Sequence, residues 1–288
     1  MKLGVHYPAQ EIAGDPDKVR TFIRAAEELG YGAISHPDHV LGASHENRDP
    51  PLSQSYDEHD SFHDPFVFFA FVAGLSDKLQ FTTGVLVLPQ RQTVLVAQQA
   101  ACLDLLSKQR LRLGVGLGWN YVEYNALGQE FATRASRIEE QVELLRHLWR
   151  EPLLDFTGRY HRVDRACLNP RPKRQIPIWY GGFSEPGYKR GARIAEGFFF
   201  AGTRQTALAG MERVRHYLTE FGRDHDDFGL ELAVLFGRDA RDVAETLKVW
   251  QDAGGTHGAV ATARRRFGAD VDAHIDFMVE VKASLDRG

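Results

Sequence analysis

Strand-like and helix-like segments alternate along the whole chain, and this alternation restricts the fold more than any other feature. Short, mostly apolar runs predict eight strands, at residues 2–7, 33–36, 80–88, 111–115, 176–180, 197–201, 229–236 and 256–262. Helical spacing of apolar residues predicts the segments between them, at 15–29, 65–75, 93–106, 134–149, 186–195, 205–221, 240–253 and 270–286. Strands that are apolar on both faces are typical of a parallel sheet covered by helices.

Eight strand–helix units in 288 residues, with no break in composition, predict one domain over residues 1–288. The expected fold is an α/β protein, a (β/α)8 TIM barrel; a doubly wound sheet is the alternative, but it usually has fewer strands. Residues 153–168 predict a short β-excursion between the fourth helix and the fifth strand. A barrel carries its functional groups at the carboxyl ends of the strands, so we expect the site there.

Composition excludes several classes of protein. The net charge of −4 gives no general attraction to nucleic acid or to a membrane surface. Only Cys102 and Cys167 are present, without CxxC spacing, which argues against a disulfide framework or a zinc site and fits the cytoplasm. The N-terminal segment lacks the apolar stretch of a signal peptide, and the apolar run at 66–73 is too short to span a bilayer.

Glycines follow two of the predicted strands. Gly114, Gly116 and Gly118 lead directly to Trp119, and Gly181-Gly182 follow the fifth strand. Glycine lets a ligand approach the backbone, and exposed N–H groups can face an anion, but a tight turn produces the same pattern. The dinucleotide fingerprint is not met, because the third glycine comes too early. With aromatic residues and few acids at the strand ends, the pattern favours a planar, anionic cofactor.

Several stretches in a fixed order match a known family. They are residues 37–40 (Pro-Asp-His-Val), 83–91, 113–119 with Glu123, 127–128 and Arg134, then 148–149, 177–182 and 190–197. On these residues the chain resembles the bacterial-luciferase-like superfamily, and within it the coenzyme F420 (deazaflavin)-dependent oxidoreductases. The resemblance covers nearly the whole chain. It implies a homodimeric barrel that holds a flavin-type ring in its mouth and acts on a small-molecule substrate.

The resemblance also implies roles for individual residues. His39 would be the active-site proton donor or acceptor, and Asp38 a catalytic-site polar contact to the ring. The bond between Gly84 and Val85 would be a cis peptide behind the ring. The cofactor-binding residues implied in this way are Asp38, Thr83, Gly84, Val85, Gly116, Gly118, Trp119, Asn120, Gly181, Gly182 and Ser184. The two glycines after the fifth strand would hold the phosphate.

Two departures bear on the choice of cofactor and substrate. Sugar-phosphate dehydrogenases of this group carry an acid where this chain has Trp119, which argues against their substrate. Luciferases place an arginine for the FMN phosphate where this chain has Leu117. We therefore expect coenzyme F420 and hydride transfer to or from a small organic substrate. FMN with a monooxygenase reaction is the alternative.

Other functions remain open at this stage. A metal-dependent barrel hydrolase is suggested by His36, Asp38 and His39, with His45, His59 and His63 nearby, although strands five, six and eight offer no further ligands. A binding module without turnover is a third class.

Three further features are expected around the cofactor. An aromatic pocket would be formed by Trp119, Phe183, Tyr180 and His6. The loop 42–64 would act as a lid, and the basic run 264–266 would hold an anionic tail.

Overall fold

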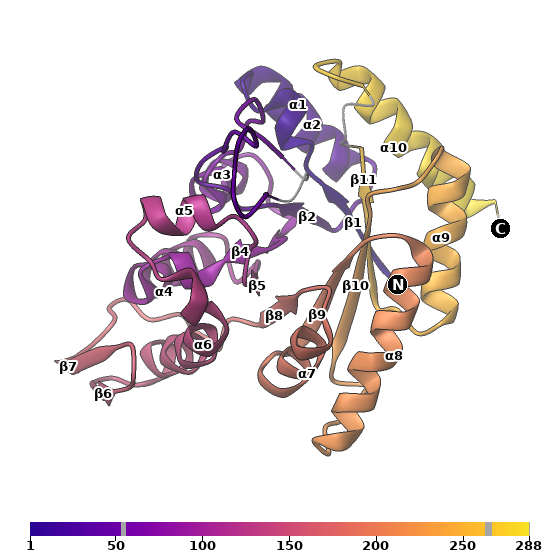
Figure 1. The fold of residues 1–288 in the computed structure, drawn as a ribbon. Coiled ribbons are helices and arrows are strands. Elements are labelled where there is room, and N and C mark those ends of the chain that lie inside the picture. Colours follow the sequence, from indigo (N-terminus) through magenta and orange to yellow (C-terminus); the bar gives the residue numbers. More distant parts are fainter. Residues whose placement is uncertain (53–55, 263–266, 288) are drawn as a thin grey trace.

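The computed structural model describes residues 1–52, 56–262 and 267–287, and its centre is a closed parallel barrel (Figure 1). Neighbouring strands follow the order β3-β2-β1-β11-β10-β9-β8-β5, and pairing of β3 with β5 closes the ring. The bounds are β1 Lys2–His6, β2 Ala33–His36, β3 Gln80–Thr83, β5 Leu111–Gly116, β8 Ile178–Gly181, β9 Gly197–Ala201, β10 Gly229–Val234 and β11 His257–Ala261. The predicted (β/α)8 barrel is confirmed.

Helices surround this barrel and pack on the apolar outer faces of its strands. They are α1 Ala9–Ile12, α2 Pro16–Glu28, α3 Pro65–Ala73, α4 Thr93–Leu106, α5 Tyr121–Ala126, α6 Arg134–Arg150, α7 Glu185–Ile194, α8 Arg204–Glu220, α9 Ala240–Asp252 and α10 Val271–Asp286. Side chains cap several of them: Asp15 accepts hydrogen bonds at the start of α2, and Asp64 does so at the start of α3. Among the helices of the described residues, none is long and apolar enough to cross a membrane.

The predicted third strand is wrong in its second half. β3 ends at Thr83, and the chain resumes pairing only in the two-residue strand β4, Leu86–Val87, before a 3-10 turn at Leu88–Gln90. Both pieces pair with β5, but the two residues between them interrupt the hydrogen-bond ladder. The peptide bond between Gly84 and Val85 is cis, as the resemblance implied.

The β-excursion is present as a separate two-stranded antiparallel hairpin, β6 Leu154–Thr157 and β7 Arg162–Ala166. It extends beyond α6, away from the barrel (Figure 1). Glu140 on α6 fastens it, because its carboxylate accepts from the backbone N–H groups of Arg159 and Tyr160 and lies 2.8 Å from His161 Nδ1. The hairpin is thus anchored at its turn.

Charged and bulky residues fill the amino-terminal half of the barrel interior. Arg112 on β5 pairs with Glu231 on β10, and its guanidinium stacks on Trp179 at 4.1 Å. β5 and β10 are not neighbours in the sheet, so this contact crosses the interior. Burial lowers the pKa of Arg112 and raises that of Glu231. A cavity of about 330 Å³ opens at this end, opposite the carboxyl ends of the strands.

Candidate active site

Glycine, alanine and serine occupy most of the inward positions at the carboxyl ends of the strands. Side chains alternate along each strand, so every second residue points into the barrel. The next inward position after Arg112 and after Trp179 is a glycine, and the next after Glu231 is Ala233. His6 on β1 is level with Ser35 on one side and Ala261 on the other. The inward positions at this end are His6, Ser35, Gly84, Gly116, Gly181, Ala201, Leu235 and Ala261, and we call them the barrel mouth. Phe199 on β9 lies one inward position below Ala201 and packs close to Gly84.

The glycine-rich ends of β5 and β8 lie against each other and against Val85. A Cβ on Gly116 would come within 2.5 Å of Val85 Cγ2 and 3.2 Å of the Gly181 carbonyl oxygen. A Cβ on Gly181 would come within 2.7 Å of Val85 Cγ1. Gly118 has φ +65° and lies close to Val87. These glycines therefore make room for the segment that follows β3, in addition to any ligand.

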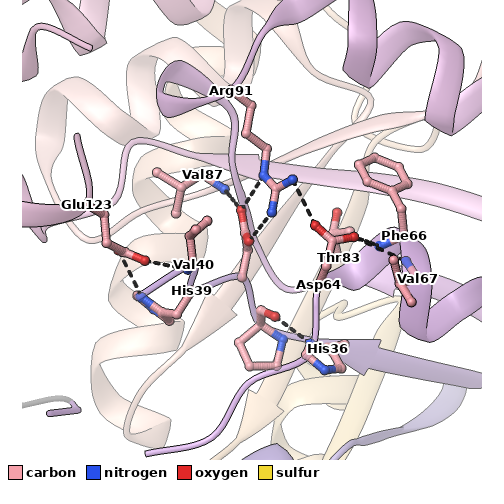
Figure 2. A network of polar contacts seen from close by, with 12 residues as sticks. His36, His39, Val40, Asp64, Phe66, Val67, Thr83, Val87, Arg91 and Glu123 are labelled. Atoms are coloured by element: carbon pink, nitrogen blue, oxygen red, sulfur yellow. Dashed lines mark hydrogen bonds and ion pairs between the residues drawn. The ribbon is translucent and has the colours of Figure 1, made fainter. Parts of the chain in front are cut away.

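His39 and Glu123 form a buried pair on the segments that follow β2 and β5 (Figure 2). His39 follows β2 after two residues, and Glu123 lies in the first turn of α5, which Asn120 caps. Glu123 Oε2 is 3.1 Å from His39 Nδ1, while Oε1 accepts from the backbone N–H groups of Val40 and Leu41 at 2.5 and 3.1 Å. One carboxylate thus holds both the imidazole and the backbone beyond it.

Aromatic rings surround the imidazole of His39. The ring centroids of Tyr56, Phe62 and Trp119 lie 4.0, 5.0 and 6.0 Å from it. Two of these rings come from the predicted lid, which has neither helix nor strand in residues 42–52 and 56–64. The indole Nε1 of Trp119 is buried and has no hydrogen-bond partner in the described structure. A donor of this kind is available to an acceptor on a bound molecule.

Asp38 lies in a different network, with Arg91. Figure 2 labels the partner residues Arg91, Val87 and Asp64 of this network. Its fully buried carboxylate accepts from Arg91 Nη2 at 2.6 Å, from Arg91 Nε at 3.0 Å and from the Val87 N–H at 2.9 Å. Arg91 Nη1 donates to Asp64, the residue that caps α3. Burial opposes the charge of Arg91, but the two carboxylates outweigh it and raise its pKa. The network joins the β2 exit to β4 and α3.

The other sequence-predicted residues make local contacts. Thr83 donates its hydroxyl to the Gly114 carbonyl at 2.6 Å. Asn120 caps α5, and Ser184 caps α7 by accepting from the Gly187 N–H. Gly182 is the most open of the glycines after β8, since no atom lies closer than 3.5 Å to a Cβ placed there. The cofactor roles of these residues remain predictions.

Burial holds two histidines at this end of the barrel neutral. His6, whose Nδ1 is 2.9 Å from Ser35 Oγ, has its pKa lowered to about 4. His36 points away from the mouth and stacks on Tyr7, and burial lowers its pKa to about 3. His6 can therefore contact a ligand in the mouth as a neutral group, while His36 belongs to the layer between strands and helices.

The family model for luciferase-like monooxygenases matches residues 1–283. The chain belongs to that family. Its curated relatives include an F420-dependent glucose-6-phosphate dehydrogenase of Kineococcus radiotolerans, 26% identical over 87% of this chain and 72% of the relative. They also include the pyrimidine monooxygenase RutA of Acinetobacter baylyi, 29% identical over 65% of this chain and 52% of the relative. A solved F420-dependent secondary alcohol dehydrogenase with an F420-acetone adduct has a TM-score of 0.79 at 17% identity, covering 99% of both chains.

Sequence reasoning gave no role to two buried residues of these networks. Arg91 and Glu123 were part of the motifs that carry the resemblance, but neither was assigned a role. Their partners lie 53 and 84 positions away, so no local pattern pairs them. The available signal was burial: a charged side chain predicted to lie inside needs an opposite charge close by.

The histidines proposed for a metal hydrolase do not gather around one point. In residues 1–52, 56–262 and 267–287, the group whose ligand atoms lie within 4.8 Å of one another is Asp57, Glu58 and His59, on an exposed part of the loop after β2. These side chains make separate contacts: His36 Nδ1 with the Pro37 carbonyl oxygen, Asp38 with Arg91, and His39 with Glu123. The basic run 264–266 lies outside the described residues.

Proposed function

We propose that this luciferase-like protein is an F420-dependent oxidoreductase that transfers a hydride between the deazaflavin and a small organic substrate. The observation that carries the proposal is a barrel mouth formed mostly by glycine, alanine and serine, with the buried His39–Glu123 pair held where the chain leaves β2. The F420-dependent relatives support the choice of cofactor. Trp119, in place of the acid of sugar-phosphate dehydrogenases, leads us to expect no activity with glucose 6-phosphate.

The residues at the mouth fit a planar ring. Ser35, Gly116, Ala201 and Ala261 contribute only small side chains to the inner surface, and Val85 provides an apolar floor against the ends of β5 and β8. The unpaired Trp119 N–H would donate to an acceptor on the ring. Gly182 and the first turn of α7 would receive the phosphate, because helix N-termini and bare N–H groups favour anions.

When bound, F420 supplies a ring carbon that accepts or donates a hydride, and the protein supplies orientation and proton transfer. His39 Nε2 would take the proton that leaves the substrate in the oxidative direction and return it in the reductive direction. Asp38 is occupied by Arg91, so we assign it the task of fixing the β2 exit rather than direct contact with the proton. The aromatic rings around His39 would exclude water from this step.

Binding and turnover with each cofactor test the proposal. Fluorescence titration should show tighter binding of oxidised F420 than of FMN, and anaerobic incubation with a panel of alcohols should bleach the F420 absorbance. Tight FMN binding with oxygen-dependent turnover would replace it with the monooxygenase alternative, which the similarity to RutA favours. Stoichiometric zinc with hydrolase activity, or a bound cofactor without redox activity, would contradict both.

We further propose a cytoplasmic homodimer of single-domain chains. α3 and α4 pack side by side and are apolar on most of their surface, yet Val67, Val94, Leu95 and Leu106 are between 49% and 83% exposed. A helix that is apolar all round is normally buried on every side. A second copy of this chain would cover these faces.

A further inference from the structure

We propose that Glu123 is a positioning residue that selects the tautomer of His39 needed for proton transfer. This inference rests on the proposed function, because it matters to catalysis only if His39 carries a proton. It concerns a contact within the chain, however, so the contact itself can be measured without any cofactor.

The two oxygens of Glu123 have separate tasks. Oε1 accepts from two backbone N–H groups, those of Val40 and Leu41, which occupies that oxygen. Oε2 is left to face His39 Nδ1 at 3.1 Å. The Glu123 side chain is 1% exposed and the His39 side chain 6%, so water does not compete strongly for these contacts.

The division of contacts determines which imidazole nitrogen carries the proton. An ionised carboxylate only accepts hydrogen bonds, so Nδ1 must be the donor. In the neutral ring the lone pair then lies on Nε2, which has no hydrogen-bond partner among the residues that the structure describes. A base with its lone pair on Nε2, and a counter-charge behind Nδ1 when it is protonated, is the arrangement that proton exchange with a substrate requires.

The substitution Glu123→Gln changes the hydrogen bond to the His39 ring without removing the contacts that hold the backbone. The glutamine carbonyl oxygen can keep both backbone contacts with Val40 and Leu41, and the side chain keeps its size. Its NH2 group then faces Nδ1, which must become an acceptor, so the ring proton moves to Nε2. The backbone at Val40 and Leu41 therefore keeps its contacts, while the His39 ring changes to the other tautomer.

The chain offers a matched control. Glu140 also contacts a histidine Nδ1, that of His161, and two backbone N–H groups, but it fastens the hairpin β6–β7. Glu140→Gln makes the same chemical change far from the strand ends that form the mouth. It should leave the His39 signals and the turnover rate unchanged.

The test is the 15N–1H spectrum of the histidine rings in the cofactor-free protein at alkaline pH, with His39 assigned by its loss in His39→Asn. We expect His39 to carry its proton on Nδ1 in the wild type and in the control Glu140→Gln, and on Nε2 in Glu123→Gln. We also expect Glu123→Gln to lower kcat about 100-fold or more while the Kd for F420 changes less than about threefold.

The outcomes distinguish failure of the tautomer inference from failure of the proposed function. An Nε2–H ring in the wild type, or the same tautomer in the wild type and in Glu123→Gln, would overturn the inference whichever cofactor binds. An inverted tautomer with lower kcat supports it. An inverted tautomer with unchanged kcat would remove His39 from the proposed reaction and with it the catalytic role of Glu123. Urea unfolding of each variant verifies that it remains folded.

Discussion

At the scale of single residues, the site depends on buried charges that compensate one another. Asp38 and Glu123 are both almost fully buried, and each carboxylate accepts three hydrogen bonds. An isolated charge at such positions is costly, so each requires its partners. We expect loss of the Asp38 contacts to lower mainly the free energy of unfolding, and loss of the Glu123–His39 contact to lower mainly the rate of proton transfer.

Arg91→Ala should destabilise the protein strongly. It leaves the Asp38 carboxylate buried without its cation and also frees Asp64 at the start of α3. We expect a loss of about 3–5 kcal/mol in the free energy of unfolding, measured by urea denaturation. Asp38→Asn combined with Arg91→Met should recover part of this loss, because no unpaired charge remains. A loss below about 1 kcal/mol for Arg91→Ala would show that the Arg91–Asp38 ion pair contributes little to the free energy of unfolding.

Stability should fall as the pH falls below about 6.5, the ordinary pKa of histidine. Burial lowers the pKa of His6 to about 4 and that of His36 to about 3, so the unfolded chain binds protons that the folded protein does not. Each histidine then lowers the free energy of unfolding by up to about 1.4 kcal/mol per pH unit, from about pH 6.5 down to its folded pKa.

His36→Phe isolates one of these contributions, since the ring stacks on Tyr7 and lies 4.5 Å from Phe68. Urea denaturation at several pH values between neutral and about pH 5 should give a shallower pH dependence for the variant than for the wild type. Equal slopes in the two proteins would mean that His36 titrates normally in the folded state.

At the scale of elements, the segment between β3 and β4 shapes the mouth. Val85 lies in the space that Gly116 and Gly181 leave open, so these three residues form one packing unit. The glycines were predicted from the sequence as a ligand-binding feature, but their contact with Val85 was not, because it joins segments 31 and 96 positions apart by residue number.

Gly116→Ala should disturb this unit. The added methyl would lie 2.5 Å from Val85 Cγ2, and a stiff β-branched side chain cannot easily move aside. We expect a loss of about 1–3 kcal/mol in the free energy of unfolding. Val85→Ala removes the clashing methyl, so the double variant should lose less than the sum of the two single variants. Strict additivity would argue against direct contact.

The elements themselves were largely predictable. Apolar runs identified the barrel strands, and Asp-Pro at 64–65 gave the start of α3, since both signals are local. The six residues of α5 and the interruption after Thr83 were missed, because the first is too short for a periodic pattern and the second arises from packing against β5. The sequence singled out His39 and Asp38 as candidate site residues but not their partners Glu123 and Arg91, because tertiary contacts determine these pairs.

At the scale of the whole molecule, the exposed apolar faces of α3 and α4 predict self-association. Light scattering should give twice the mass of the chain. Glu substitutions at Val67 and Leu95, which are 69% and 52% exposed, should convert the dimer to a monomer with little effect on the folding of each chain. A wild-type monomer at micromolar concentration would contradict the proposal.

The central claim is that the deazaflavin ring occupies the barrel mouth, and the affinity of Ala201→Phe for F420 tests it most directly. Ala201 is an inward position at the end of β9, whereas Ala209 lies on the exposed face of α8, so Ala209→Phe is the control. Fluorescence titration should show binding weakened about 10- to 100-fold in Ala201→Phe and unchanged in the control, with both variants folded. Equal affinity in the wild type and Ala201→Phe would contradict the account.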